Sequence, residues 1–374
     1  FFFACVAPSG GMILLVLLAF LPPVALALAT RLLWPRLRPP ARRPPTDSTD
    51  KNAKPYALYR SKAVPEDVDV IIIGAGPGGL VPAVQMAQAG LRVLVLEQHD
   101  RPGGGTHSFE SHGFEWDTGF HYLGEVATPQ FPLNRLMAHL CGDDLQWCAM
   151  EDCPVAPDEV DAIYFWDANA AAAPPTPPIC MRAGLGPIKA ELTSRFPGEE
   201  AAIDNFYNLC QACGESILPY VVVRSLPGWV QWLVPWPVRA VRLLARATTS
   251  QVLSDLTANA ELKGALAYLL GCYSSPPKQS SWIVQGMISQ HFINGGAYPV
   301  GGAMQIPLGM CRRIREAGGT ILTKASVEEI VIDGARAVGV RMAKDGAFIP
   351  ARRAVVSNAG VHHPLHSLLP AATP

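Results

Sequence analysis

The clearest pattern of apolar and polar positions lies in residues 67–100, DVDVIIIGAGPGGLVPAVQMAQAGLRVLVLEQHD. Two short runs in it, residues 68–73 and 91–96, are almost entirely aliphatic. Runs of this length and composition are typical of parallel strands that are buried on both faces. A glycine cluster and a segment of helical character that reaches Gly90 separate the two runs. The pattern predicts a strand, a glycine-rich turn, a helix and a second strand.

Farther along the chain the periodicity changes twice. It is mainly helical from about residue 125 to 295, and a helix is expected to begin at FPGEE, residues 196–200, because a proline and acidic residues are favourable in a first turn. Strand patterns return in residues 318–342, where a hairpin turn is expected at Asp333 and Gly334. A last short strand is expected within residues 351–360.

This order of elements predicts an α/β fold with a Rossmann-type nucleotide-binding domain. The domain is expected in two parts, residues 67–124 and residues 296–374, with a mainly helical substrate domain, residues 125–295, inserted between them.

The N-terminal part of the chain has a different character. Residues 1–34 contain an uncharged apolar stretch, residues 12–30, that is followed by several arginines. We expect either a retained membrane anchor or a cleaved secretory signal, and both direct a chain to the endoplasmic reticulum, whose membrane is the predicted location. Residues 35–66 are rich in Pro, Arg and Lys and are predicted to be a linker. The alanine- and proline-rich residues 168–178 are predicted to be an exposed loop.

Composition excludes some classes of function. Thirty basic residues nearly balance 31 acidic ones, and no basic patch points to nucleic acid as a partner. The apolar content of 49% favours association with a membrane. Nine scattered cysteines do not form a disulfide framework. Cys210 and Cys213 form one CxxC, and without a second pair we expect two buried thiols on a helix rather than a metal site.

One stretch allows two interpretations. Residues 217–246, ILPYVVVRSLPGWVQWLVPWPVRAVRLLAR, combine three tryptophans with aliphatic residues and four arginines. One interpretation is a buried pair of helices in the second domain. The other is a surface that inserts into the interface of a bilayer, as tryptophan and arginine often do. The four prolines argue against a transmembrane helix.

The glycine cluster has the spacing G-x-G-x-x-G, formed by Gly74, Gly76 and Gly79. It follows a predicted strand and opens a predicted helix, and Glu97 stands at the end of the next strand. In this context the first glycine permits a tight turn, the second lets a pyrophosphate approach the backbone, and the third lets helix and strand pack closely. The acid can accept hydrogen bonds from ribose hydroxyls. The unit therefore predicts a dinucleotide site.

The residues after the second strand favour FAD over NAD as the bound dinucleotide. Arg101, Pro102, Gly103 and Gly104 resemble the second glycine motif of flavoproteins with two dinucleotide-binding domains. The segment DTG, residues 117–119, continues that resemblance.

The blocks VLVLEQHDRPGGGTHSFESHGFEWDTGFHYLGEV, HFINGGAYPVGGAMQIPLGMCRRIREAGGTILTKASVEEIV and VVSNAG resemble the phytoene desaturase and carotenoid isomerase superfamily, from about Pro65 onward. By position, the resemblance implies that the following residues hold FAD: Gly74, Gly76, Gly79, Glu97, Arg101, Gly103 and Gly104, with Val327 at the adenine and Ser357 and Asn358 near the flavin end. Superfamily members continue into a segment that closes the flavin site, so the second part of the domain is expected to be incomplete here.

The resemblance also implies a reaction. It points to members that reduce one double bond of a retinoid or another polyene lipid, with NAD or NADP as a source of electrons. Desaturation or isomerisation of a carotenoid is an alternative, as is a flavin amine oxidase. A lipid-binding protein of the Rab escort and GDP-dissociation type, without redox chemistry, is another alternative, and so is an inactive fragment.

The sequence assigns no catalytic residue. His121 and Tyr122 are candidates for handling a proton, with structural hydrogen bonding as the alternative. Tyr298, in a glycine-rich turn, is expected to shape a cofactor site, and His291 is expected to pack or cap a helix. The pair His362 and His363 is expected in solvent.

Overall fold

The computed structural model of the chain describes residues 54–153, 157–165 and 177–370. The expected anchor or signal, most of the expected linker and most of the alanine-rich loop lie outside these residues.

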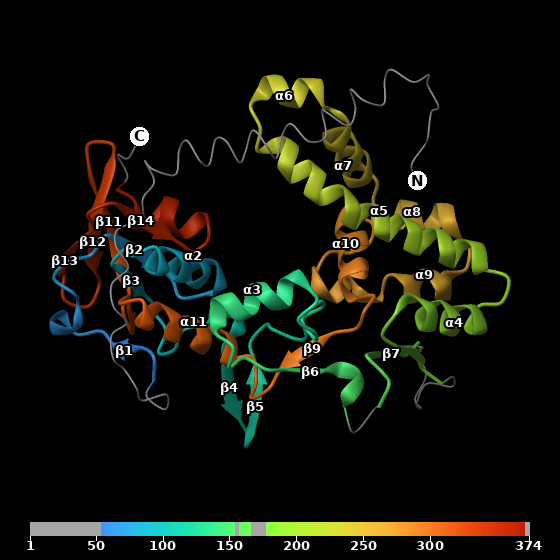
Figure 1. Cartoon of the computed structure of the whole chain (residues 1–374), viewed down its shortest axis with the longest axis horizontal. Helices are drawn as coiled ribbons and strands as arrows, with labels where there is room; N and C mark the ends of the chain where they lie inside the picture. Colours follow the sequence, from blue (N-terminus) through green and yellow to red (C-terminus); the bar gives the residue numbers. More distant parts are fainter. Residues whose placement is uncertain (1–53, 154–156, 166–176, 371–374) are drawn as a thin grey trace.

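A five-stranded parallel sheet forms the centre of the first lobe (Figure 1). Its strand order is β1 (Ala57–Leu58), β10 (Thr320–Thr323), β3 (Val93–Leu96), β2 (Val70–Ile73) and β14 (Ala354–Ser357). The predicted βαβ unit is present, because α2 (Pro77–Gln88) connects β2 to β3 and the two strands pair in parallel. The Rossmann-type architecture predicted from the sequence is therefore confirmed.

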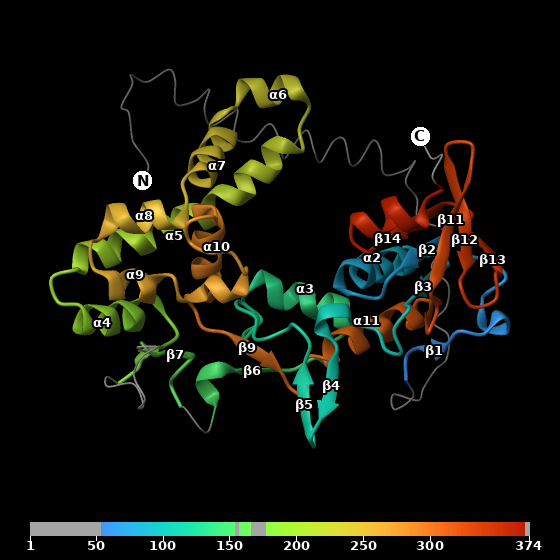
Figure 2. The same ribbon diagram turned by 180° about the vertical axis from the view of Figure 1, so that it is seen from behind.

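The sheet is covered on both faces, which explains its almost continuous aliphatic strands. Alternate residues of β2 and β3, such as Ile72 and Val95, pack under α2, α3 (Pro132–Cys141) and α11 (Gln305–Glu316). Their neighbours, such as Ile71 and Leu94, pack on the other side, against an antiparallel sheet. Figure 2 shows this second sheet beside the first, with strands β11 (Val327–Asp333), β12 (Arg336–Met342) and β13 (Phe348–Pro350). The hairpin expected near Gly334 joins β11 to β12.

Two expected boundaries differ from the structure. Residues 54–66 were expected to end the linker, but β1 is an edge strand that pairs with β10, and Tyr59 is buried. The first part of the nucleotide-binding domain was expected to end at residue 124, but α3 packs into the same core as α2 and α11. Both corrections have one physical reason: short or weakly periodic segments acquire their place from partners that are distant in sequence.

The second lobe is mainly helical and has a separate core. Its helices are α4 (Leu185–Arg195), α5 (Glu200–Arg224), α8 (Thr249–Leu256), α9 (Ala260–Leu266) and α10 (Trp282–Phe292). Trp282 and Phe206 meet edge to face in the middle of this core. Cys210 and Cys213 are fully buried on α5, as predicted for the CxxC pair. The helix expected after FPGEE is α5, which begins at Glu200.

The remaining elements are short. Two-stranded antiparallel ladders join β4 (Ser108–Ser111) to β5 (Phe114–Asp117), β6 (Trp147–Ala149) to β9 (Ala297–Pro299), and β7 (Asp161–Ile163) to β8 (Ile179–Met181). Short helical turns lie at Ser61–Ala63, Gly104–Thr106, Met150–Asp152, Tyr268–Cys272 and Pro364–Leu368.

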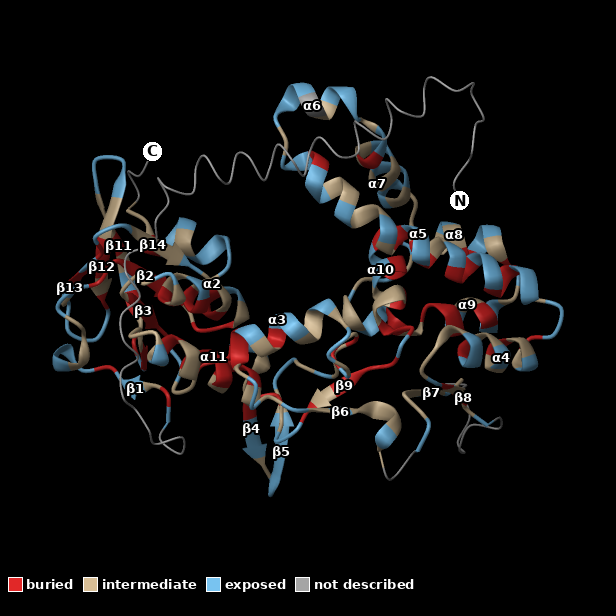
Figure 3. Ribbon diagram, in the orientation of Figure 1, coloured by how far each residue is buried: buried red, intermediate tan, exposed pale blue. Residues whose placement is uncertain are grey.

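Residues 217–246 form a projection that we call the tryptophan arm. It consists of the last turns of α5 together with α6 (Gly228–Leu233) and α7 (Trp236–Arg246), and Figure 3 shows α6 standing apart from both cores with largely exposed residues. Trp229, Trp232 and Trp236 are 70%, 78% and 62% exposed. The interpretation of this stretch as a buried helix pair is therefore wrong. None of the helices in the described part of the chain is long and apolar enough to cross a membrane.

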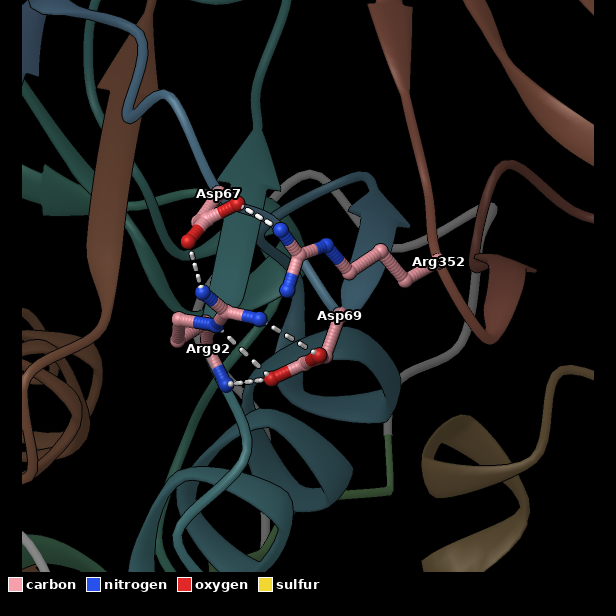
Figure 4. A network of polar contacts seen from close by, with 4 residues as sticks. All are labelled: Asp67, Asp69, Arg92 and Arg352. Carbon is pink, nitrogen blue, oxygen red and sulfur yellow. Dashed lines mark hydrogen bonds and ion pairs between the residues drawn. The ribbon is translucent and has the colours of Figure 1, made fainter.

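A polar network fixes the amino ends of the central strands (Figure 4). Asp69, 8% exposed, accepts hydrogen bonds from the Arg92 backbone N–H at 2.9 Å and from its Nε at 3.1 Å. Asp67 is ion-paired with both Arg92 and Arg352. The network connects the segments that lead into β2, β3 and β14, at the end of the sheet opposite the glycine-rich turn.

Candidate dinucleotide-binding site

A cavity of about 490 Å³ opens at the carboxyl ends of β2 and β3. Ligands of open α/β sheets bind at such carboxyl ends, where the direction of strand connection changes. The cavity is lined by residues of the glycine motif, of both strand ends and of the last described turn. Among the residues predicted for the site, Gly74, Gly76, Glu97, Arg101, Gly104, Val327 and Asn358 line it.

The glycine turn is packed so closely that side chains are excluded. Gly74 has φ +96°, a conformation that favours glycine. A Cβ on Gly79 would lie 2.1 Å from the Gly74 carbonyl oxygen. Gly79 does not line the cavity, and its place against Gly74 is the close helix–strand packing predicted for the third glycine of the motif. The turn delivers the chain to the N-terminus of α2, whose dipole favours a negative ligand group.

Glu97, which follows β3, holds the glycine turn by a hydrogen bond. It is 9% exposed, and its Oε2 accepts a hydrogen bond from the Ala75 backbone N–H at 2.7 Å. Its Oε1 accepts one from the His99 backbone N–H at 2.8 Å. Each carboxylate oxygen can accept a further bond, so Glu97 can orient the glycine turn and still accept a hydroxyl donor from a ligand.

The second glycine motif contacts the first. The backbone N–H of Gly103 donates to the carbonyl of Ala75 at 2.8 Å, and Gly103 has φ +127°. A Cβ on Gly104 would lie 3.0 Å from the Gly76 Cα. The Arg101 guanidinium donates to the Ser108 carbonyl at 2.8 Å, which holds this cation at the cavity wall. Gly103 therefore shapes the cavity from behind, while Gly104 and Arg101 face it.

The turn after β14 reaches the cavity. The side chain of Asn358 lies over the glycine turn, where a Cβ on Gly76 would be 3.0 Å from its Nδ2, and its place near the flavin end stays a prediction. Ser357 is exposed, pairs with Ile73 in the sheet and does not line the cavity. The parallel pairing of β14 with β2 is the reason, because it carries the end of β14 directly to the glycine turn.

Sequence reasoning missed several cavity residues. His99, His107 and His363 all line it, and the rings of His99 and His107 are 5.3 Å apart. His363 is exposed, as predicted, but it lies at the edge of the cavity. No motif marks these three side chains; their proximity comes from the fold.

The other candidates, His121, Tyr122, Tyr298 and His291, do not line this cavity. The Tyr122 hydroxyl donates to Asp161 Oδ2 at 2.5 Å, and burial raises the pKa of Tyr122, so structural hydrogen bonding occupies it. His121 packs near it, with ring centroids 5.0 Å apart. The Tyr298 hydroxyl donates to Asp117, and burial raises the pKa of Tyr298 to about 12. His291 packs on Phe292, with centroids 4.7 Å apart, in agreement with its predicted packing role.

In the described part of the chain, no group of three or more His, Cys, Asp or Glu side chains could hold a metal ion.

Comparison with known proteins agrees with this geometry. Residues 72–140 match the family model of the NAD(P)-binding Rossmann-like domain. The chain is 34% identical over 323 residues to all-trans-retinol 13,14-reductase of Danio rerio, covering 83% of this chain and 51% of that protein. It is 28% identical over 308 residues to the chloroplastic prolycopene isomerase of Daucus carota, covering 78% of this chain and 46% of that protein. The chain thus spans about half the length of these curated relatives.

A solved structure shares the fold. The crystal structure of an oxidoreductase from Methanosarcina mazei superposes with a TM-score of 0.54 at 17% identity, covering 78% of this chain and 59% of that one. The chain is therefore similar, over about half of their length, to the all-trans-retinol 13,14-reductases and, at lower identity, to a prolycopene isomerase, and it shares the fold of a solved oxidoreductase.

Proposed function

We propose that the cavity at the glycine turn binds FAD. The residues present fit this group. Gly76 and Gly104 leave backbone without side chains where a diphosphate would lie, and the α2 N-terminus and Arg101 supply positive potential beside it. Glu97, at the end of β3, is placed to accept ribose hydroxyls, and Val327 offers an apolar wall to an adenine. The observation that carries the proposal is the contact between the two glycine motifs.

We infer that the protein is an oxidoreductase that reduces the 13,14 double bond of all-trans-retinol to give 13,14-dihydroretinol, with NAD or NADP as the source of electrons. The relatives named for this reaction support the inference. The chemistry that FAD supplies when bound is hydride transfer to one carbon of a conjugated bond. The chain's residues would bind the cofactor, hold the apolar polyene and exclude water from both.

The test is anaerobic incubation of the purified, flavin-loaded protein with all-trans-retinol and a reductant, followed by mass spectrometry of the product. A gain of two hydrogens at one double bond is expected. An unchanged mass with altered retention indicates isomerisation, and a loss of two hydrogens indicates desaturation; either result rejects the proposed direction. A colourless protein that binds lipid without any reaction supports the carrier alternative instead.

We further propose that the protein works at the membrane of the endoplasmic reticulum and that the tryptophan arm contacts the bilayer. The arm carries three exposed tryptophans together with exposed Leu233 and Leu243. Arg224, Arg239, Arg242 and Arg246 supply positive charge, and residues 216–254 contain no Asp or Glu. Aromatic and basic side chains in this combination suit the interface of an anionic bilayer.

Vesicle sedimentation tests this contact. The protein is expected to sediment with vesicles of phosphatidylcholine and phosphatidylserine, and less with phosphatidylcholine alone. Replacing Trp229, Trp232 and Trp236 together by Ser is expected to weaken binding by tenfold or more, since each buried indole contributes on the order of 1 kcal/mol or more. The exposed Phe109→Ser and Phe114→Ser pair, on the β4–β5 hairpin, is the control. Equal losses in both variants would reject the arm as the contact.

A further inference from the structure

A second cavity lies in the helical lobe, away from the glycine turn. It is a groove of about 910 Å³ between α5 and α10. That volume falls within the usual range of roughly 300–1,000 Å³ for small-molecule sites. Its walls are mainly apolar and include Leu185, Ile217, Leu218, Met287, Ile288 and Ile293. A groove of this kind suits a long apolar ligand.

Several polar residues interrupt the apolar walls, and we call three of them the polar corner: Glu125, Gln290 and His291. His291 Nε2 accepts a hydrogen bond from the Gly124 backbone N–H at 2.9 Å, so the ring proton resides on Nδ1. Burial lowers the pKa of His291, which keeps the ring neutral near pH 7. Gln290 Oε1 is buried and has no hydrogen-bond partner within the described chain. The polar corner thus contains an acceptor that lacks a donor.

Glu125 occupies an unusual backbone conformation. Its φ is +57°, which is uncommon for a residue other than glycine and costs on the order of 1 kcal/mol. The two residues that precede it are held in place by the rest of the fold. Leu123 exchanges two backbone hydrogen bonds with Ala297, and a Cβ on Gly124 would lie 2.2 Å from the His291 carbonyl oxygen. The fold therefore holds a carboxylate at the groove in spite of the strain.

The charge of the groove selects among amphiphilic ligands. Its lining within the described chain contains two acids, Glu125 and Glu215, and no Lys or Arg. An alcohol can donate its proton to Glu125 or to Gln290 Oε1 and accept from the neutral His291. A carboxylate can donate nothing and meets negative charge at short range, which disfavours it.

We propose that this groove binds the polyene substrate by its apolar chain, with the terminal hydroxyl at the polar corner, and that Glu125 makes the site select an alcohol over the corresponding carboxylate. The inference rests on the proposed retinoid chemistry for the identity of the ligand. Leu218 and Pro219 belong both to the groove and to the tryptophan arm, so a ligand that leaves the bilayer beside the arm meets the groove directly.

Binding without turnover tests the proposal. All-trans-retinol and all-trans-retinoate are titrated into the oxidised protein without reductant, and quenching of tryptophan fluorescence is followed. Wild-type protein is expected to bind retinol about tenfold more tightly or better. Glu125→Gln is expected to bring the two affinities to within about threefold, mainly by tighter binding of retinoate. Glu110→Gln, on the exposed β4 strand, is the matched control and should retain the wild-type ratio.

Two outcomes would overturn the inference: equal affinities in the wild-type protein, or a preference for retinol that Glu125→Gln leaves unchanged. The result is independent of the cofactor proposal. Selective retinol binding by a protein that takes up no flavin would support the groove and reject the flavin site. A flavin-loaded protein that binds neither retinoid would reject the groove alone.

Discussion

Substitution of Gly79 by Ala tests how the nucleotide site is built. The added Cβ would lie 2.1 Å from the Gly74 carbonyl oxygen, whereas ordinary contact begins near 3.4 Å. The start of α2 and the glycine turn must therefore separate by about 1.3 Å. Because the neighbour is backbone and not the end of a flexible side chain, no rotamer change can relieve the overlap. Overpacking of this kind costs about 2 kcal/mol.

Two quantities should change together. Thermal unfolding, followed by circular dichroism, should show a midpoint lower by a few degrees. Flavin retained after dialysis, measured as the ratio of flavin to protein absorbance, should fall, because a cost of about 2 kcal/mol at the binding turn corresponds to roughly 30-fold weaker binding.

Gly186→Ala is the control for this experiment. Gly186 lies in the first turn of α4, and nothing comes within 4 Å of a Cβ placed on it. Alanine is favoured over glycine in a helix, so this variant should be as stable as the wild type or slightly more stable. If Gly79→Ala kept the flavin content and the unfolding midpoint of Gly186→Ala, the close-packing argument would be refuted.

Two further predictions concern ionisable groups. Hydrogen bonds from Arg92 lower the pKa of Asp69 to about 2 from 3.8, so its stabilisation, about 2 kcal/mol, is complete above pH 4 and is lost as the pH falls toward 2. In urea unfolding, Asp69→Asn should be less stable than wild type at pH 7 and should approach it near pH 2; a constant difference would contradict the argument. Burial raises the pKa of the Cys210 and Cys213 thiols, that of Cys213 to about 11, whereas Cys148 is exposed. A thiol reagent should therefore label Cys148 in the native protein and the buried pair only after unfolding, as peptide mass mapping would reveal; rapid native labelling of the pair would show that α5 opens.

The sequence alone determined the nucleotide-binding unit. The aliphatic runs fixed β2 and β3, because strands buried on both faces leave no place for polar residues. The spacing of Gly74, Gly76 and Gly79 predicted the turn, because the backbone conformation and the close packing that require glycine involve residues only a few positions apart. Glu97 followed from its place at the end of the second strand. Each of these inferences depends on local conformation, and the structure agrees with each.

The tertiary structure decided what depends on partners distant in sequence. The tryptophan arm has the same composition whether it is buried or exposed, and only the tertiary structure shows that its indoles are exposed. Asn358 reaches the glycine turn because β14 pairs with β2, and the polar corner forms because Glu125 lines the same groove as His291 of α10. The local periodicity of the sequence does not predict such contacts, because they form only when separate elements pack against one another.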